Sequence, residues 1–433
     1  MVAIIIAVLT ALFMTLSVLF KPEIVIGRIK LGLYWIICLI GAIFMLIFGG
    51  FPISYLLQKI TADTSVNPIK ILTLFLSMTL LSVYLGDAGF FYLVANKVFN
   101  KARGGQLKLF LTLYAVVAVL TVFTSNDIII LTLTPPICIF AKKAKISPIP
   151  FLIGEFVCAN TWSTMLIIGN PTNIYLAQSA GISFIKYFGV MWLPSIVCGL
   201  TSLIVLILLF RNQLKTPLPK IDDDCSKDKP LDKVRAIVSG AHLIICLIML
   251  AVCEFIGVEM WLICLALCIS LTLFNLVYGF IKDKNAVKVL LSLKKAPYEL
   301  IPFVLSMFVI ICGLEHSGIT QTLNKLMITN TAIDGITFGF ASALSANLLN
   351  NIPMSVLFSS ILQGGSHYAL FGSIIGSNLG AFITPVGALA GIMWNRVLSD
   401  YEIKLPFYKF VLYGIAVALP TIALSCASLL ITL

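Results

Sequence analysis

Charged residues are scarce in this chain of 433 residues. They make up 11% of the sequence, whereas hydrophobic residues make up 60%. A soluble domain carries about 25% charged residues. Together with a mean hydropathy of +1.07, this scarcity excludes a soluble globular protein and predicts an integral membrane protein.

Residues that form metal sites, disulfides or nucleotide sites are few or scattered. The chain has 3 histidines, and its 11 cysteines form no Cys-x-x-Cys pair and lie mostly within apolar runs, where they should act as small hydrophobic residues. No Walker motif appears, so any use of ATP would need a separate subunit. We therefore expect no cofactor and no metal beyond a transported or coupling Na⁺. The net charge of +11 is explained by lysines in short loops rather than by a nucleic-acid surface.

Apolar runs of the length that crosses a bilayer, about 20 residues, recur along the whole chain. They cover residues 2–20, 31–50, 71–94, 150–178, 187–210, 239–257, 259–280, 298–314, 367–395 and 408–431. Two further runs, 109–141 and 334–363, are too long for one crossing and too short for two. Each is expected to form a re-entrant helical hairpin. The predicted fold is an all-α membrane protein with about ten transmembrane helices and two such hairpins.

Basic residues in the loops predict how the chain is oriented. The hairpin at 109–141 is flanked on both sides by basic loops, whereas the loops around 334–363 are nearly free of lysine. The basic residues around the first hairpin are Lys97, Lys101, Arg103, Lys108, Lys142, Lys143 and Lys145. The hairpins should therefore enter from opposite faces of the cytoplasmic membrane. This indicates an inverted repeat of residues 1–210 and 239–433, joined by a cytoplasmic linker at 211–238, with both termini outside.

Two matching sets of polar and helix-breaking residues interrupt the apolar runs. In the hairpins, Thr124-Ser125-Asn126-Asp127 is matched by Asn350-Asn351-Ile352-Pro353. In the runs 150–178 and 367–395, Gly169-Asn170-Pro171-Thr172-Asn173 is matched by Thr384-Pro385-Val386-Gly387. Proline and glycine should unwind both of these helices near the bilayer centre. Polar, irregular segments are costly at membrane depth, so their recurrence in both halves predicts a transporter's binding site.

Hydroxyl and amide side chains in these four segments are the predicted substrate contacts. They are Ser125, Asn126, Asn160, Thr161, Asn170, Thr172, Asn350, Asn351, Asn378 and Thr384. A coupling ion is expected at Asp127, with Asn126, Gly169 and Gly387 beside it. The alternatives are that the small polar residues only allow close helix packing and that Asp127 caps a helix. Asp87 and Glu155 are second candidates, each near a cytoplasmic end or paired structurally.

The four interrupted segments contain no arginine or lysine. An anion would therefore be held by helix ends, amides and hydroxyl groups, with a bound cation as a further source of positive charge. A substrate that is neutral at pH 7 would fit equally well. We expect Asn126→Ala, Asn350→Ala and Asn378→Ala each to abolish binding while leaving the protein folded.

These motifs resemble the ion transporter superfamily of secondary carriers, and within it the branch of arsenite/antimonite permeases and citrate transporters. The resemblance rests on Asn126-Asp127 followed by Leu131-Thr132-Leu133-Thr134-Pro135, on the second hairpin tip, and on Gly376 to Gly380 with Trp394. Sodium-coupled dicarboxylate carriers usually show Ser-Asn-Thr at the hairpin tips, which this chain does not. The resemblance implies a scaffold region, a moving region that carries the substrate, and frequent dimers.

The resulting functional hypothesis is a secondary active transporter for a small anion, either an arsenite-like oxyanion or a carboxylate, coupled to H⁺ or Na⁺. If it is of the arsenite type, an ATPase subunit is a further candidate partner besides the lipid bilayer. The alternative within the superfamily is a cation/proton antiporter. A membrane-embedded enzyme would need a Ser–His pair, an acid dyad or a metal cluster at depth, which histidines near span ends do not supply. A sensor without transport is the remaining alternative.

Overall fold

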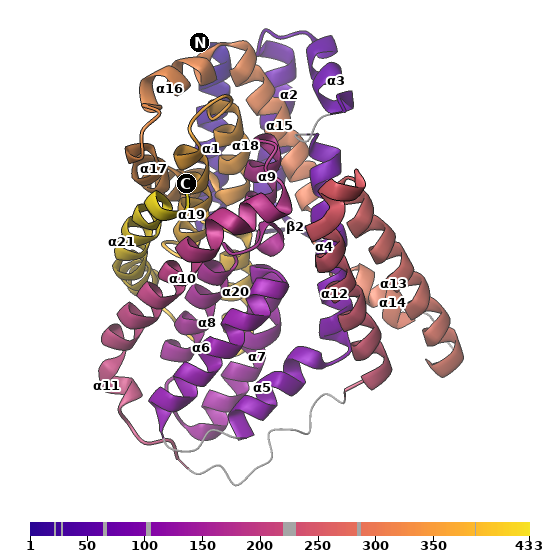
Figure 1. Cartoon of the computed structure of the whole chain (residues 1–433), viewed down its shortest axis with the longest axis vertical. Helices are drawn as coiled ribbons and strands as arrows, with labels where there is room; N and C mark the ends of the chain where they lie inside the picture. The colour runs from indigo at the N-terminus through magenta and orange to yellow at the C-terminus, as the bar shows by residue number, and fades with distance from the viewer. Residues whose placement is uncertain are drawn as a thin grey trace.

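The structure is a computed structural model that describes residues 1–20, 23–26, 29–63, 67–100, 105–219, 231–283, 287–385 and 387–433. It is almost entirely helical (Figure 1), as the scarcity of charge and the long apolar runs predict. Most of the predicted linker, residues 220–230, lies outside the described residues, as do Lys101, Arg103 and Val386.

The described part of residues 1–219 contains eleven α-helices, two short strands and one short 3₁₀ helix. They are α1 (Val2–Phe20), β1 (Glu23–Ile26), β2 (Ile29–Gly32), α2 (Leu33–Phe48), α3 (Ile53–Thr61), α4 (Pro68–Asp87), α5 (Phe90–Asn100), α6 (Gln106–Phe123), α7 (Asn126–Ala144), α8 (Ile149–Trp162), η1 (Ile167–Gly169), α9 (Pro171–Ser179), α10 (Phe184–Leu209) and α11 (Arg211–Leu214). In the second part, from residue 231 on, all the regular elements among the described residues are helices. Its helices are α12 (Lys233–Ile256), α13 (Met260–Asp283), α14 (Val287–Leu293), α15 (Leu300–His316), α16 (Ile319–Met327), α17 (Ile333–Leu349), α18 (Asn351–Ile361), α19 (His367–Gly380), α20 (Leu389–Asp400) and α21 (Phe407–Thr432).

Several helices have the length and composition of membrane spans. In the described part of the chain, 6 helices qualify, namely α4, α6, α10, α12, α13 and α21, and the bent pair α15–α16 would be a seventh. The stretch Val2–Ser17 of α1 and the whole of α2 are apolar but shorter. The protein is therefore a multi-pass membrane protein, while the total of about ten spans stays a prediction.

Breaks occur at the polar segments that the sequence singles out. Helix α8 ends at Trp162 and α9 begins at Pro171, where the Asn170 side chain accepts a hydrogen bond from Thr172 N at 3.2 Å. Proline at the first position of α9 loses no helical hydrogen bond, because the first N–H groups of a helix have no partner. Helix α19 ends at Gly380 and α20 begins at Leu389. The chain also turns between α6 and α7 and between α17 and α18, at residues 124–125 and 350.

Three local features differ from the sequence prediction. The run 71–94 is not one helix, because the chain breaks between α4 and α5 at Gly89, whose φ of 89° is open mainly to glycine. The run 298–314 continues past Gly318 (φ 78°) into α16, which is bent by 77° from α15. Strands β1 and β2 form a small antiparallel sheet, and Gly32 N at its end donates to Glu299 Oε1 at 3.3 Å.

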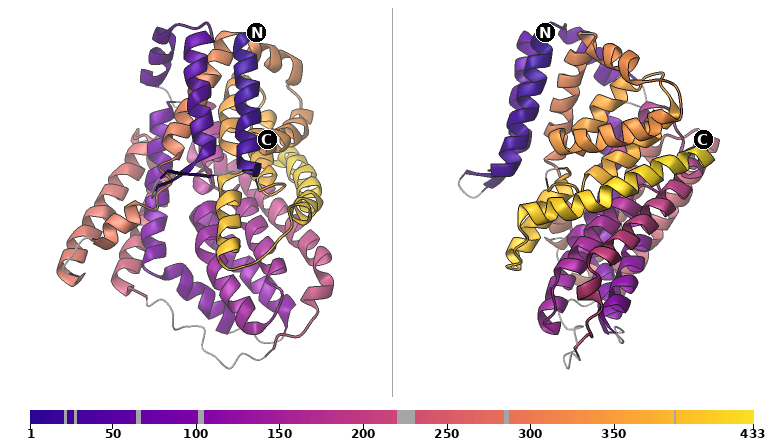
Figure 2. Two further views of the ribbon diagram at one scale, coloured as in Figure 1. Left: turned by 180° about the vertical axis from the view of Figure 1, so that it is seen from behind. Right: turned by 90° about the vertical axis from the view of Figure 1, so that its left-hand side faces the viewer.

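Two sets of elements follow the same order and pack on each other. The hairpin α6–α7, the broken helix α8–α9 and the long helix α10 are followed later by the hairpin α17–α18, the broken helix α19–α20 and the long helix α21. Helices α10 and α21 both have 26 residues and run beside each other (Figure 2). Helix α9 packs on α18, and α20 packs on α7. The second part of each broken helix therefore contacts the hairpin of the other set.

Helices α17 and α19 approach so closely that only glycine fits between them. A Cβ atom on Gly376 would lie 1.9 Å from the Gly339 carbonyl oxygen, and one on Gly372 would lie 2.2 Å from that of Gly335. Small residues spaced by four positions allow such backbone contact between membrane helices. The contact fixes the second hairpin against the first part of the broken helix α19–α20.

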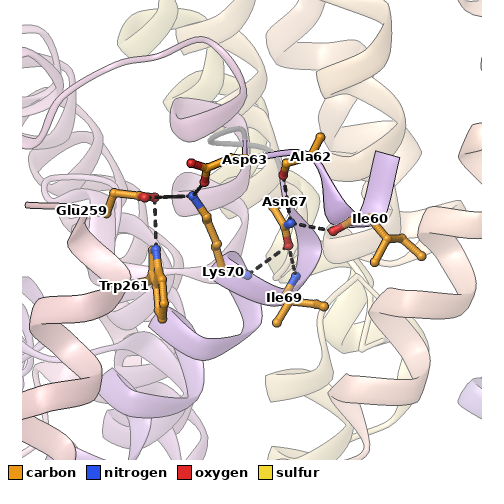
Figure 3. Close-up of polar contacts among 8 residues, drawn as sticks. All are labelled: Ile60, Ala62, Asp63, Asn67, Ile69, Lys70, Glu259 and Trp261. Atoms are coloured by element: carbon orange, nitrogen blue, oxygen red, sulfur yellow. Dashed lines mark hydrogen bonds and ion pairs between the residues drawn. The ribbon is translucent and has the colours of Figure 1, made fainter. Parts of the chain in front are cut away.

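A polar cluster at the start of α4 ties this helix to the loop between α12 and α13 (Figure 3). The Asn67 side chain accepts from Ile69 N at 2.9 Å and donates to the Ile60 and Ala62 carbonyl groups at 2.6 and 3.1 Å. One turn later, the Lys70 ammonium group pairs with Asp63 and lies 2.6 Å from a Glu259 carboxylate oxygen. The cap and the ion pairs position α4 relative to α13.

Candidate functional site

The tip of the α6–α7 hairpin is held by a pair of buried amides. Asn126 Nδ2 donates to Asn160 Oδ1 at 3.1 Å, and Asn160 Nδ2 donates to the Phe156 carbonyl oxygen at 2.8 Å. The second bond fixes which way the Asn160 amide points, and this in turn fixes the Asn126 amide. Asn126 Oδ1 then faces away from Asn160, and it is buried with no hydrogen-bond partner in the described structure.

Ser125, the residue before Asn126, is also unsatisfied. It is the N-cap residue of α7, but its side chain makes no capping hydrogen bond. Its hydroxyl oxygen is buried and has no partner among the described residues. A buried polar group left unpaired costs about 1–3 kcal/mol. The N-terminus of α7 also carries a positive dipole end that its own N-cap side chain does not neutralise. This tip therefore has the properties of a ligand-binding position.

Asp127 lies in the first turn of α7 and is partly exposed. No hydrogen bond or ion pair of its carboxyl group is found in the described part of the chain. It is not the cap of α7, because that position belongs to Ser125. Its carboxyl group can therefore bind a proton or a cation, and a helix N-terminus favours its negative charge.

Asn378 joins the two broken helices. Its Oδ1 accepts from Ser163 Oγ at 3.0 Å and from Asn170 Nδ2 at 2.9 Å. Its Nδ2 donates to Asn173 Oδ1 at 2.7 Å and to the Ile374 carbonyl oxygen at 2.8 Å. An amide has two lone pairs on oxygen and two hydrogens on nitrogen, so protein partners satisfy all four. Asn378 therefore bridges α19 to the α8–α9 junction.

The tip of the α17–α18 hairpin is held against the break between α19 and α20. Asn347 Oδ1 accepts from Thr384 N at 3.0 Å and from Thr384 Oγ1 at 2.6 Å, and Asn347 Nδ2 donates to the Gly380 carbonyl oxygen at 2.9 Å. Asn351 N donates to the Gly387 carbonyl oxygen at 3.0 Å. Asn350 between them has a φ of 71°, which is rare for a residue with a side chain.

Among the remaining predicted site residues, Thr161 bonds within its own helix, Thr172 contacts the other broken helix, and the two glycines shape the backbone. Thr161 Oγ1 donates to the Cys158 carbonyl oxygen at 3.0 Å. Thr172 Oγ1 lies 3.2 Å from Ser377 Oγ. A Cβ atom on Gly169 would lie 2.1 Å from the Ser163 carbonyl oxygen, so the chain at this break requires glycine. On Gly387 it would lie 2.8 Å from the Gly380 carbonyl oxygen.

The second candidates, Asp87 and Glu155, both have protein partners. Asp87 accepts from Ser292 Oγ at 2.6 Å and pairs with Lys295, so it ties the end of α4 to the segment that includes α14. Glu155 is buried in α8, where its two carboxyl oxygens lie 3.1 and 2.9 Å from Thr134 Oγ1.

The structure thus brings the predicted residues together in three hydrogen-bonded groups rather than one. The first joins Asn126 to Asn160, the second surrounds Asn378, and the third surrounds Asn347. They follow one another along α8 and α19. Ser163 Oγ, which donates to Asn378, also lies 2.9 Å from the Asn160 carbonyl oxygen, a second acceptor within reach of its one hydrogen, and Asn347 contacts Gly380. The prediction omitted Ser163, Asn173 and Asn347. Asn173 and Asn347 lie within polar motifs that could have revealed them, whereas nothing in the sequence distinguishes Ser163.

Comparison with known proteins places this arrangement in a family. The family described as "Citrate transporter" (CitMHS) matches residues 1–369. The chain belongs to the citrate transporter family. It is therefore a membrane transporter by family, as its apolar helices and polar breaks indicate.

Curated relatives of this family member include proteins named for arsenic. An arsenical pump membrane protein of Escherichia coli is 26% identical over 376 residues, which covers 83% of this chain and 85% of the relative. A putative arsenical pump membrane protein of Bacillus subtilis is 22% identical over 401 residues, which covers 86% of this chain and 88% of that relative. Among solved structures, the YdaH transporter of Alcanivorax borkumensis is similar with a TM-score of 0.60 and 14% identity, over 99% of this chain and 97% of that chain. That similarity supports the fold alone.

Proposed function

We propose that the protein is a secondary active transporter that moves a small oxyanion or carboxylate across the cytoplasmic membrane, coupled to H⁺ or Na⁺. The proposal rests on two buried oxygens at the α6–α7 tip, Ser125 Oγ and Asn126 Oδ1, which have no hydrogen-bond partner among the described residues. Buried polar atoms in native proteins almost always have a partner. A substrate bound at the tip supplies that partner.

The chemistry of the tip favours a ligand that both accepts and donates hydrogen bonds. The hydroxyl group of Ser125 and the N-terminal amides of α7 can donate to a substrate oxygen. Asn126 Oδ1 can only accept, so it calls for a substrate hydroxyl group or a cation. A protonated oxyacid of the arsenite type can accept hydrogen bonds from the tip and also donate one to Asn126 Oδ1. A carboxylate can accept the same hydrogen bonds, and a coupling cation at Asp127 would then be the partner of Asn126 Oδ1. The relatives named arsenical pump membrane proteins favour the first of these.

Two opposed sets of hairpins and broken helices support alternating access. The repeats proposed for residues 1–210 and 239–433 would place one hairpin toward each face of the membrane, with both termini outside. Because α9 packs on α18 and α20 packs on α7, a shift of one hairpin moves the broken helix of the other set. In this arrangement the substrate site opens to one side at a time. A homodimer, and a separate ATPase subunit for arsenite export, are the partners this proposal allows.

Transport by purified protein in proteoliposomes tests the proposal. We expect saturable uptake of labelled arsenite or citrate that depends on an imposed pH or Na⁺ gradient. Loss of one hydrogen bond to a ligand costs about 1–3 kcal/mol, so Asn126→Ala should weaken the apparent affinity by a factor of about 5 to 150. Asn275→Ala is the matched control, since Asn275 is also buried but, within the part of the chain that the structure describes, its side chain bonds only to the Leu271 carbonyl oxygen of its own helix, at 2.9 Å. Equal loss in both variants, or no gradient-dependent uptake, would refute the proposal.

A further inference from the structure

Glu155 is a buried carboxyl group that the proposed substrate site does not use. It lies in α8, five positions before Asn160, and its side chain is only 1% exposed. Building on the proposed function, we propose that Glu155 is the site that binds and releases the coupling proton. The proposal deepens the coupling step, because it selects H⁺ and assigns it to a residue away from the hairpin tip.

The hydroxyl group of Thr134 has fewer hydrogens than it has acceptor groups within hydrogen-bond distance. Thr134 Oγ1 lies 2.6 Å from the Ile130 carbonyl oxygen and 2.9 and 3.1 Å from the two carboxyl oxygens of Glu155. The hydroxyl group has one hydrogen, and a carbonyl group can only accept. If the threonine hydrogen goes to Ile130, the contact with Glu155 needs a hydrogen from the carboxyl group. The geometry is therefore that of a neutral carboxylic acid donating to Thr134 Oγ1.

Among the described residues, the titratable groups that interact with Glu155 are thiols and not charged partners. They are Cys138 on α7 and Cys158 on α8, and Cys158 in turn interacts with Tyr114 of α6 and Cys198 of α10. Helix α19 has no titratable residue between Ala369 and Gly380. No lysine, arginine or second acid acts on Glu155 in the described part of the chain. An unpaired carboxylate buried in this way would be costly.

Trp394 offers a hydrogen bond that the present arrangement does not use. It comes from α20, is fully buried, and packs on Phe156 with ring centroids 4.9 Å apart. Its indole N–H faces the Glu155 carboxyl group, but it lies outside hydrogen-bond geometry and has no other partner in the described structure. When Glu155 loses its proton, the Thr134 hydroxyl group and the Trp394 indole N–H can both donate hydrogen bonds to the carboxylate. We therefore expect release of the proton to shift α20 toward α8, so that Trp394 reaches the carboxylate, and to move α7 through Thr134.

This rearrangement links the proton to the substrate site. Thr134 and Asn126 lie on the same helix, and eight residues of α-helix span about 12 Å. On α8, Glu155 is followed by Asn160, which bonds Asn126 directly. Uptake of one proton by the carboxylate gives the neutral acid bonded to Thr134, and loss of that proton on the other side of the membrane restores the carboxylate. A shift of α7 that accompanies either step displaces Ser125 and Asn126.

The decisive variant is Glu155→Gln, because the glutamine amide can donate to Thr134 Oγ1 as the acid does but cannot release a proton. With arsenite and citrate as probes in proteoliposomes, we expect exchange of labelled for unlabelled probe to stay within about twofold of wild type, whereas accumulation driven by a pH gradient falls by at least about tenfold, or 1.4 kcal/mol. Unchanged gradient-driven accumulation in the variant would overturn the assignment. Absence of transport by the wild type would instead refute the proposed function.

Infrared spectroscopy tests the proton itself and does not depend on transport. Purified wild-type protein at neutral pH should show the band of a protonated buried carboxylic acid. This band should disappear in Glu155→Gln, persist in Asp127→Asn, and shift in Thr134→Val, which removes the hydroxyl partner. Should Glu155→Gln fail to fold, the shift in Thr134→Val remains the test. A wild-type protein without the band, or a band that Thr134→Val leaves in place, would overturn the proposal.

Discussion

Replacement of Asn378 by alanine separates a bridging role from a substrate-binding role. The change removes three bonds between α19 and the α8–α9 junction, those to Ser163, Asn170 and Asn173. The Ile374 carbonyl group keeps its backbone partner, because it lies four residues earlier in the same helix. Ser163 Oγ can turn its hydrogen to the Asn160 carbonyl oxygen, which lies 2.9 Å away. The variant therefore leaves two buried groups unpaired, Asn170 Nδ2 and Asn173 Oδ1.

The expected cost follows from these two groups and three bonds. Hydrogen bonds between membrane helices average about 0.6 kcal/mol each, which gives a lower figure of about 2 kcal/mol for three. Two orphaned buried groups at about 1–3 kcal/mol each give an upper figure of about 6 kcal/mol. We therefore expect Asn378→Ala to lower the free energy of unfolding by about 2–6 kcal/mol. The sequence alone suggested a folded protein that no longer binds substrate.

Equilibrium unfolding in mixed micelles measures this difference, with Asn275→Ala as the control for loss of one helix-internal amide bond. A double-mutant cycle with Asn173→Ala should show a coupling free energy between the two positions, because their side chains bond directly at 2.7 Å. The bridging role is wrong if the free energy of unfolding of Asn378→Ala lies within about 0.5 kcal/mol of the wild-type value and the variant binds no substrate. Asn378 would then contact the substrate itself.

Other parts of the structure give further predictions. Asn67→Ala removes the cap of α4 and its bonds to two carbonyl groups, so thermal unfolding in detergent should show a loss of about 1–2 kcal/mol; an unchanged melting temperature would contradict the cap. Gly376→Ala forces a Cβ atom against the Gly339 carbonyl oxygen and should cost about 1–3 kcal/mol, whereas Gly240→Ala, with nothing within 4 Å of its Cβ, should be neutral or stabilising in the same assay. Partial burial raises the pKa of Asp232, but hydrogen bonds from Lys282 and the backbone of Arg235, and the charges of both residues, lower it more, to a net value below 3.8. Its stabilising contribution should be complete above pH 3.8, fall as the pH drops below that value, and be absent in Asp232→Asn at every pH; a wild type and variant that respond equally to acid would contradict it.

The sequence predicts the fold well where covalent geometry decides the outcome. Proline and glycine cannot continue a membrane helix without loss of hydrogen bonds, so the breaks near Pro171 and Pro385 could be found from the residues alone. The turns at residues 124–125 and 350 follow from run lengths that fit neither one crossing nor two. The bends at Gly89 and Gly318 were missed, because a single glycine inside an apolar run is often tolerated within a helix.

The sequence predicts the site less completely, because hydrogen-bond partners come from distant segments. Ser163 and Asn378 are 215 positions apart, and no local pattern shows that they meet. Residues that look alike in the sequence motifs therefore play two different roles: some bond only to other protein groups, and others keep an atom free to bind a ligand. Asn378 is saturated by protein partners, whereas Ser125 and Asn126 keep unpartnered oxygens. For Glu155 the sequence offered only a choice between a helix end and a structural pair, whereas the structure shows a buried acid bonded to Thr134.

Chemical labelling at the tip of the α6–α7 hairpin tests the central claim most directly. Ser125→Cys places a thiol where the unpartnered hydroxyl group lies, and Ser428→Cys on α21 gives a buried control whose parent hydroxyl bonds within its own helix. With a membrane-impermeant thiol reagent applied from one side and then the other, position 125 should react from both sides, and saturating arsenite or citrate should slow that reaction while position 428 is unaffected. Reaction from one side only, or at a rate that neither substrate changes, would contradict a substrate site at this tip.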